Sequence, residues 1–206
     1  MIARVLIVML CAFIATGDRA WAGSSAPEQV EDRLVQAREL LEAAAITHQE
    51  EDYRKAFNAF LPLAEEGNPE AQETVGRMYG IGDGVELNQC DSTYWDDKAA
   101  RAGRPWAQHL MGWNYWNGHG VIRDHDLAYL WFMTAARNGS PDAAKDASIL
   151  AQSDLRTPGR VEALNQRLRT WRPEDQPPAR IIRMPNIWGL NWVMRLNGLT
   201  PCRFEP

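Results

Sequence analysis

Residues that commonly carry enzyme or metal chemistry are scarce in this sequence, which has three cysteines and four histidines among 206 residues. His119 and His125 lie near Asp124 and Asp126, but this spacing matches no closed zinc pattern. No nucleophile elbow is present. The glycine-rich stretch 80–84 follows a predicted helix rather than a strand, which argues against a phosphate loop. We therefore predict no catalytic residue, no metal site and no cofactor.

The sequence also lacks an apolar run long enough to stay comfortably in a bilayer. The run 5–16 is too short. It follows Arg4 and is succeeded by Ala20-Trp21-Ala22, a layout typical of a secretory signal peptide cut after Ala22 rather than of a retained anchor. Cys11 lies inside the run behind Leu10, which disfavours a lipoprotein. We expect a bacterial protein of the periplasm or the exterior, without stable membrane insertion after cleavage.

Basic residues are outnumbered by acidic residues in most of the chain. Residues 23–155 carry 11 basic and 22 acidic residues, a net charge of −11, whereas residues 156–206 carry nine arginines and four acids, a net charge of +5. An acidic body lacks the basic face that nucleic acid requires, so we expect the tail to fold back on the body or to meet an anionic partner. Adjacent Asp96 and Asp97 point in different directions on a helix, and we interpret them as surface charges.

Cleavage after Ala22 would remove Cys11 and leave two cysteines, Cys90 and Cys202. Export implies an oxidising compartment, where an even number of cysteines favours pairing. We predict one disulfide between Cys90 and Cys202, with two free or intermolecular thiols as the alternative.

A repeat of 36 residues runs through the middle of the chain. Positions recurring at this offset include Ala64/Ala100/Ala136, Gly67/Gly103/Gly139, Ala71/Ala107/Ala143, Gln72/Gln108, Gly76/Gly112, Tyr79/Tyr115, Gly82/Gly118, Gly84/Gly120, Val85/Val121 and Trp95/Trp131. Residues 90–102 and 125–138 have helical periodicity and end at a glycine suited to a helix C-terminus. A proline two residues later (Pro69, Pro105, Pro141) is suited to the first turn of the next helix. Each unit is therefore predicted to be a helical hairpin that must stack on its neighbours to bury its apolar face.

This pattern resembles the Sel-1-like repeat family, a relative of the tetratricopeptide repeats. The motif stands here as Ala99-Ala100-Arg101-Ala102-Gly103 followed by Ala107-Gln108 through Val121. The first copy has Glu65 where the family often has alanine, and the third loses the pattern after Ala143. The resemblance implies an all-α, right-handed α-solenoid and a role as an assembly platform for other proteins.

The flanks are predicted to extend this solenoid. We expect a signal peptide over 1–22, an N-terminal helix over 23–50, the repeat solenoid with a C-terminal capping helix over 51–173, and an Arg- and Trp-containing tail over 174–206. The capping helix should run from Thr157-Pro158 to Trp171, with Val161, Leu164, Leu168 and Trp171 on one face. The tail is too apolar to remain free in water, and we expect residues 180–206 to dock on the solenoid as a cap or as an occluding segment.

The residues that differ between copies are the candidates for partner binding. Large or polar side chains in the second turn and on the following helix give the predicted protein-binding set: Trp116, Asn117, His119, Tyr129, Phe132 and Met133. Trp113 is interpreted as packing on the next hairpin, and Trp95 and Trp131 as core.

We thus predict an exported, non-catalytic scaffold or regulator that binds another protein, such as an envelope or signalling component. The alternatives are an envelope-acting hydrolase and a protein that binds a small ligand or glycan of the cell wall. Trp116 and the tail tryptophans are the residues that would bind glycan.

Overall fold

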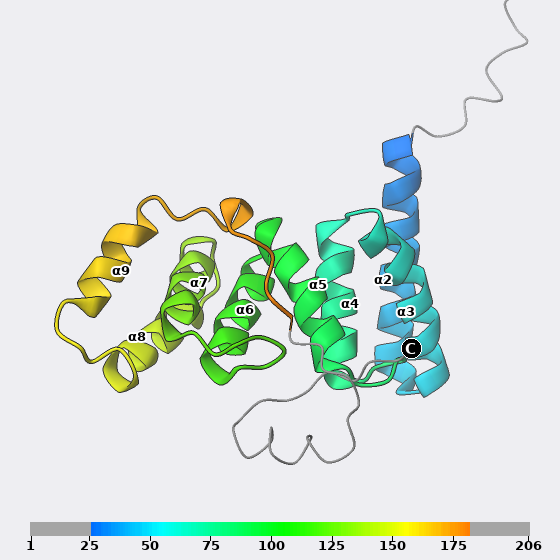
Figure 1. Ribbon diagram of the computed structural model, residues 1–206. Coiled ribbons are helices and arrows are strands. Elements are labelled where there is room, and N and C mark those ends of the chain that lie inside the picture. Colours follow the sequence, from blue (N-terminus) through cyan, green and yellow to red (C-terminus); the bar gives the residue numbers. More distant parts are fainter. Residues whose placement is uncertain (1–25, 182–206) are drawn as a thin grey trace, which may run out of the picture.

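The computed structural model describes residues 26–181, which fold into helices joined by short loops. The elements are α2 (Ala26–Thr47), α3 (Glu50–Glu65), α4 (Pro69–Ile81), α5 (Gln89–Arg101), α6 (Pro105–Asn117), α7 (His125–Arg137), α8 (Ala143–Ser153), α9 (Arg160–Leu168) and the 3-10 helix η1 (Pro173–Asp175). From α2 to α8 each helix packs against the next, and α9 packs on α7 (Figure 1). The predicted all-α solenoid is confirmed. No helix within this range is both long and apolar enough to cross a bilayer.

The turns inside the hairpins follow the repeat. Gly67, Gly103 and Gly139 have φ angles of +97°, +91° and +99°, the left-handed conformation that glycine adopts without a steric penalty. Helices α4 and α6 begin at Pro69 and Pro105 as predicted. The third copy differs, because α8 begins two residues after Pro141, at Ala143.

A buried glutamine ties the two helices of each full repeat together. The side-chain amide of Gln108 donates to the carbonyl oxygen of Ala100 at 3.0 Å, and Gln72 donates to Ala64 at 3.1 Å. Both carbonyls lie in the last turn of a helix, where the regular intrahelical donor is missing and the N–H of the following glycine, Gly67 or Gly103, also donates to them. The recurrence of glutamine at the 36-residue offset thus has a hydrogen-bonding cause.

Small residues allow the helices to approach closely. A Cβ built on Gly112 of α6 would lie 2.4 Å from Phe132 Cδ1 of α7, and one on Gly76 of α4 would lie 2.7 Å from Asp96 Oδ1 of α5. These glycines therefore face the neighbouring helix without room for a methyl group. Apolar side chains fill the remaining space in two clusters, one around α2–α5 and one around α5–α9.

The flanking helices differ in length from the prediction. Helix α9 covers Arg160–Leu168, shorter than the predicted helix from Thr157 to Trp171. The predicted stripe is nevertheless largely buried, since Leu164, Leu168 and Trp171 are at most 5% exposed. Trp171 reaches the core from beyond the helix end, with its ring centroid 6.1 Å from that of Trp131.

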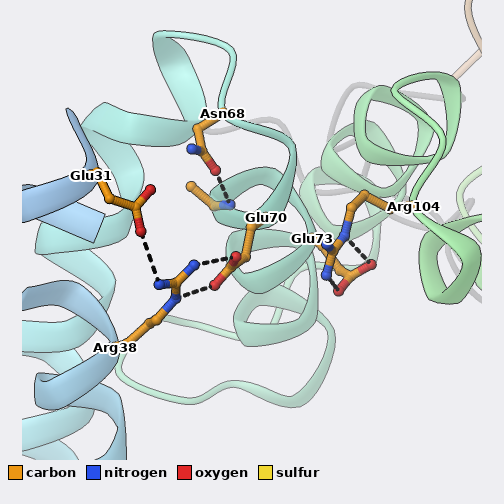
Figure 2. A network of polar contacts seen from close by, with 7 residues as sticks. Glu31, Arg38, Asn68, Glu70, Glu73 and Arg104 are labelled. Carbon is orange, nitrogen blue, oxygen red and sulfur yellow. Dashed lines mark hydrogen bonds and ion pairs between the residues drawn. The ribbon is translucent and has the colours of Figure 1, made fainter. Parts of the chain in front are cut away.

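Two arginines brace α4 from both sides (Figure 2). Arg38 of α2 donates two hydrogen bonds of 2.6 Å to Glu70 and one of 3.3 Å to Glu31. Arg104, just before α6, donates to Glu73 at 2.7 and 3.1 Å. The hydrogen bond from Arg38 holds the pKa of Glu70 below its usual range. Because these side chains are partly exposed, each pair contributes at most about 1 kcal/mol.

Candidate functional site

Beyond η1 the chain turns back and lies along the solenoid, as the orange segment in Figure 1 shows. Residues 176–181, here called the return segment, reach α5. The signal-peptide prediction and the predicted docking of the tail beyond residue 181 lie outside the described residues.

The return segment is held mainly through its backbone. The Arg101 guanidinium donates to the carbonyl oxygens of Gln176 and Pro177. Asp97 accepts the backbone N–H of Ala179 at 3.2 Å and the Nε–H of Arg101 at 2.9 Å. Such contacts depend little on which side chains the segment carries.

The equivalent arginine of the next repeat also donates to a backbone carbonyl. Arg137, 36 residues after Arg101, donates to the carbonyl oxygen of Leu168 at 2.9 Å. Both arginines lie in the last turn of their helices, α5 and α7. Arginines at the same position of two repeats therefore both donate to backbone carbonyls, Arg101 in the return segment and Arg137 at the end of α9.

The return segment and the solenoid surface beneath it enclose a cavity of about 500 Å³. The solenoid surface along which the return segment lies is here called the groove. The residues lining the cavity are Asp97, Arg101, Tyr115, Val121, Ile122, Arg123, Asp124, Asp126, Leu127, Trp131, Arg167, Trp171, Gln176, Pro177, Pro178 and Arg180. Apolar and aromatic side chains from α6, α7 and the α6–α7 loop supply much of the wall. A groove of this composition suits a ligand that combines apolar groups with a polar backbone.

The acidic side chains of the groove already have partners. Asp97 pairs with Arg101, and Asp126 accepts from Arg160 Nε at 2.8 Å. Asp124 caps α7 by accepting the backbone N–H groups of Asp126 and Leu127, each at 3.0 Å. The lining carries four arginines against these three aspartates, a net charge of +1, and within residues 26–181 Arg123 and Arg180 make no hydrogen bond or ion pair.

The prediction that Asp96 and Asp97 are surface charges is wrong. They are 2% and 6% exposed, because Asp96 faces Gly76 of α4 and Asp97 lies under the return segment. Burial raises the pKa of Asp97, against the opposing effect of Arg101. Burial raises the pKa of Asp96 to about 8, with only partial relief from Asn114 and Ser92, each at 3.5 Å.

Solved structures with the same architecture identify the repeat. A Sel1 repeat protein from Oxalobacter formigenes is 33% identical, with a TM-score of 0.51, over 58% of this chain and 87% of that one. This chain belongs to the Sel1 repeat family.

A second Sel1-like structure, a protective antigen of uropathogenic Escherichia coli displaying an SLR fold, is 27% identical with a TM-score of 0.57. The match covers 74% of this chain but 35% of the antigen, so the chain spans about a third of its length. No protein-family profile and no curated protein sequence matches the chain.

In the Sel1 framework, three predicted binding residues lie at the end of α6 and in the following loop. Trp116 is half-buried and donates to Asp154 at 2.9 Å. Asn117 is half-buried and donates to the carbonyl oxygen of Trp113 at 3.1 Å. The side chain of His119 is exposed, and its carbonyl oxygen accepts from Thr93 at 3.3 Å. The structure therefore leaves His119 accessible and gives Trp116 and Asn117 internal partners.

The other three predicted binding residues belong largely to the interior. Phe132 is 0% exposed and Tyr129 is 5% exposed, with the Tyr129 hydroxyl donating to Asn165 at 3.0 Å. Met133 is half-buried against the same core cluster. Their differences from the first copy reflect packing against α6 and α9, and Phe132 offers no surface to a partner.

Sequence comparison did not single out the aromatic face of α6. Trp113 stacks on Trp116 with centroids 4.9 Å apart and donates to Asp146 of α8 at 3.1 Å. Packing of Trp113 on the next hairpin is thus confirmed, although 37% of it remains exposed. His109 shares Asp146 at 2.6 Å, and Trp106 is 50% exposed.

The groove residues Asp97 and Arg101 were also not predicted as a site. The available signal was the arginine at matching positions of two Sel1 repeats, Arg101 and Arg137. Across residues 26–181, no three His, Cys, Asp or Glu side chains converge where a metal ion could be held.

Proposed function

We propose that this chain is an exported Sel1 repeat scaffold, without catalytic activity, that binds another protein in its groove. The observation that carries the proposal is the return segment itself. A stretch of polypeptide that is extended at Gln176 and turns at Arg180, where the Ile181 N–H donates to the Ala179 carbonyl at 2.9 Å, lies along the groove, and Arg101 and Asp97 hold it through backbone atoms. A site that binds one chain through its backbone can bind another of similar shape.

The position of the groove supports binding at a repeat surface. Its wall includes Val121, Ile122 and Arg123 of the α6–α7 loop, and the same loop carries the exposed His119. Loops on a rigid helical scaffold commonly carry binding residues. We therefore place the partner over the groove and the adjoining rim of Trp116, Asn117 and His119.

Two matched isoleucines allow a direct test. Ile122 lines the groove and is 57% exposed, whereas Ile149 of α8 lies outside it and is 45% exposed. A photo-crosslinking amino acid at each position, in the full-length chain produced in its native host, would report what lies nearby. We expect a protein crosslink from position 122 and none from position 149. Equal crosslinking, or none at 122, would contradict binding at the groove.

The same cells test export. A mature chain beginning at Gly23, recovered from the periplasm or the medium, is the expected product of cleavage after Ala22. A cytoplasmic chain that still begins at Met1 would contradict the proposal of an exported protein.

Glycan binding is the second candidate, favoured by the aromatic face of α6. Trp106 and Trp113 are 50% and 37% exposed, and flat exposed rings suit contact with apolar surface. If the chain binds cell-wall glycan, it should sediment with purified peptidoglycan, and Trp106→Ala with Trp113→Ala should abolish this. No sedimentation of the unaltered chain would remove the candidate.

A further inference from the structure

The return segment has the conformation of a polyproline helix at its start. Gln176 has φ −77° and ψ 149°, close to the polyproline II values. Pro177 and Pro178 follow, and a residue that precedes proline is itself restricted to extended conformations. The segment therefore loses little conformational freedom when it docks.

Its exposure pattern has the matching period. Gln176 and Ala179 are half-buried, whereas Pro177 and Pro178 between them are exposed. A polyproline helix has three residues per turn, so residues 176 and 179 face the solenoid together. Ala179 packs against the core cluster of α5–α9. The prolines have no N–H to lose, and the N–H that faces inward, on Ala179, is the one bound by Asp97.

Arg180, the fifth residue of the return segment, adds a positive charge next to other positive charges. Arg180 lines the cavity together with Arg123 and Arg167. Arg167 stacks over Trp171 at 5.2 Å, and within residues 26–181 neither Arg123 nor Arg180 has a hydrogen bond or ion pair. Arg123, Arg167 and Arg180 are all exposed. With Arg101, which pairs with Asp97, they give the cavity four arginines against three aspartates, a net charge of +1.

We propose that the groove binds an extended, proline-containing segment of a partner protein that carries an acidic side chain where this chain has Arg180. This inference rests on the proposed function and adds the chemistry of the partner. The return segment supplies the backbone contacts and the polyproline shape but the wrong charge at its fifth position. It occupies the groove until a partner segment of the right charge displaces it.

A free peptide must compete with the return segment, which belongs to the same chain as the groove. A tethered segment acts at an effective concentration on the order of millimolar, so a free peptide must bind well or meet a weakened competitor. Pro177→Gly with Pro178→Gly weakens the competitor by making the free segment more flexible. Because both prolines are exposed, this variant, here called the opened chain, should keep its helical content.

The experiment uses capped hexapeptides on the mature chain, residues 23–206. One peptide copies residues 176–181, Gln-Pro-Pro-Ala-Arg-Ile, a second has glutamate in place of arginine, and a third has glutamate with both prolines changed to glycine. On the opened chain we expect the second peptide to bind about fivefold more tightly than the first, since it exchanges repulsion from two arginines for attraction. This preference should vanish near about 1 M salt. The third peptide should bind more weakly than the second.

Charge variants of the groove provide the matched control. Arg123→Ala with Arg167→Ala in the opened chain should abolish the preference for glutamate without weakening the arginine peptide. The mature chain with its prolines intact should bind each peptide more weakly than the opened chain does. Within the chain, Arg180→Glu should slow hydrogen exchange of the Ala179 amide about fivefold.

Several outcomes would overturn the inference. Equal affinity for the first two peptides would remove the acidic preference, and equal affinity for the second and third would remove the polyproline requirement. No peptide binding to a helical opened chain, together with a protein crosslink at position 122, would reject this partner chemistry and leave the scaffold function standing. Loss of that crosslink while the peptides bind would instead reject the proposed function.

Discussion

The carboxylate of Asp97 accepts the backbone N–H of Ala179 at 3.2 Å, and so joins α5 to a segment 82 residues further along the chain. Arg101, one helical turn after Asp97, binds the same carboxylate and two carbonyl oxygens of that segment. A single ion pair on one repeat helix therefore holds the groove's occupant in place.

Arg101→Met is expected to release the return segment. It removes the donor to two carbonyls and the counter-charge of Asp97 while keeping much of the side-chain volume. With about 1 kcal/mol lost for each net hydrogen bond, the Ala179 amide should exchange at least about tenfold faster. Hydrogen exchange followed by mass spectrometry measures this directly.

Lys98→Met is the matched control for Arg101→Met, because Lys98 lies on the same helix but contacts Tyr94 and Trp95 rather than the return segment. Its exchange near residue 179 should equal that of the unaltered chain. Equal exchange in the Arg101 variant would show that other contacts hold the segment.

The buried Asp96 predicts a pH-dependent stability. Its pKa rises from an ordinary 3.8 to about 8 on folding, because burial penalises the charged form. Between these values the unfolded chain has released the proton that the folded chain keeps. The free energy of unfolding should therefore fall as pH increases from about 4 to 8, by at most about 1.4 kcal/mol per pH unit from this group.

Asp96→Asn isolates this contribution. The amide is similar in shape and stays neutral, so the variant should be more stable than the unaltered chain near pH 7 and close to it near pH 4. Urea unfolding across this range provides the free energies. Glu39→Gln, at an exposed position of α2, should follow the unaltered chain. A constant difference between the Asn variant and the unaltered chain across pH would contradict a buried neutral carboxyl.

The hairpin architecture could be predicted from sequence because its determinants are local and recur. A glycine with positive φ, a proline at the next helix start and an alanine at the crossing act within a few residues, so the 36-residue offset places them. The predicted boundaries were wrong in the third copy, where α8 begins two residues after Pro141, and at the capping helix.

The groove and the buried acids could not be predicted in the same way. Helical spacing predicts that Asp96 and Asp97 point in different directions, but it does not predict what covers each side chain. Asp96 is covered at Gly76 of another helix, and Asp97 by a segment 82 residues further along the chain. Phe132 was placed at a binding surface because it differs between copies. The Phe132 side chain instead fills the space left beside Gly112, which has no side chain.

The disulfide prediction concerns Cys90, which is buried at 2% exposure on α5, and Cys202, which lies outside the described residues. Tryptic digestion of the unreduced mature chain, alkylated in denaturant, should yield residues 78–98 linked to residues 196–203. Closing a loop of 112 residues contributes about 4–5 kcal/mol in the chain-entropy model, so reductant should lower the melting temperature. Both peptides recovered separately with alkylated thiols would contradict the bond.

Gly112→Ala should destabilise the protein even though alanine is the better helix former. In an exposed helix interior the exchange would stabilise by about 1 kcal/mol. Here the added Cβ would lie 2.4 Å from Phe132 Cδ1, and Phe132 is fully buried, so α6 and α7 must separate. We expect a net loss of about 1–3 kcal/mol, measured by urea unfolding.

Ser148→Ala is the control, since Ser148 occupies the same repeat position on α8 and is exposed. It should be neutral or slightly stabilising. Adding Phe132→Leu to Gly112→Ala should recover part of the loss, because the smaller side chain makes room for the methyl group. A stabilising Gly112→Ala would mean that the helices tolerate a wider spacing, and that the repeated glycine is not required for their approach.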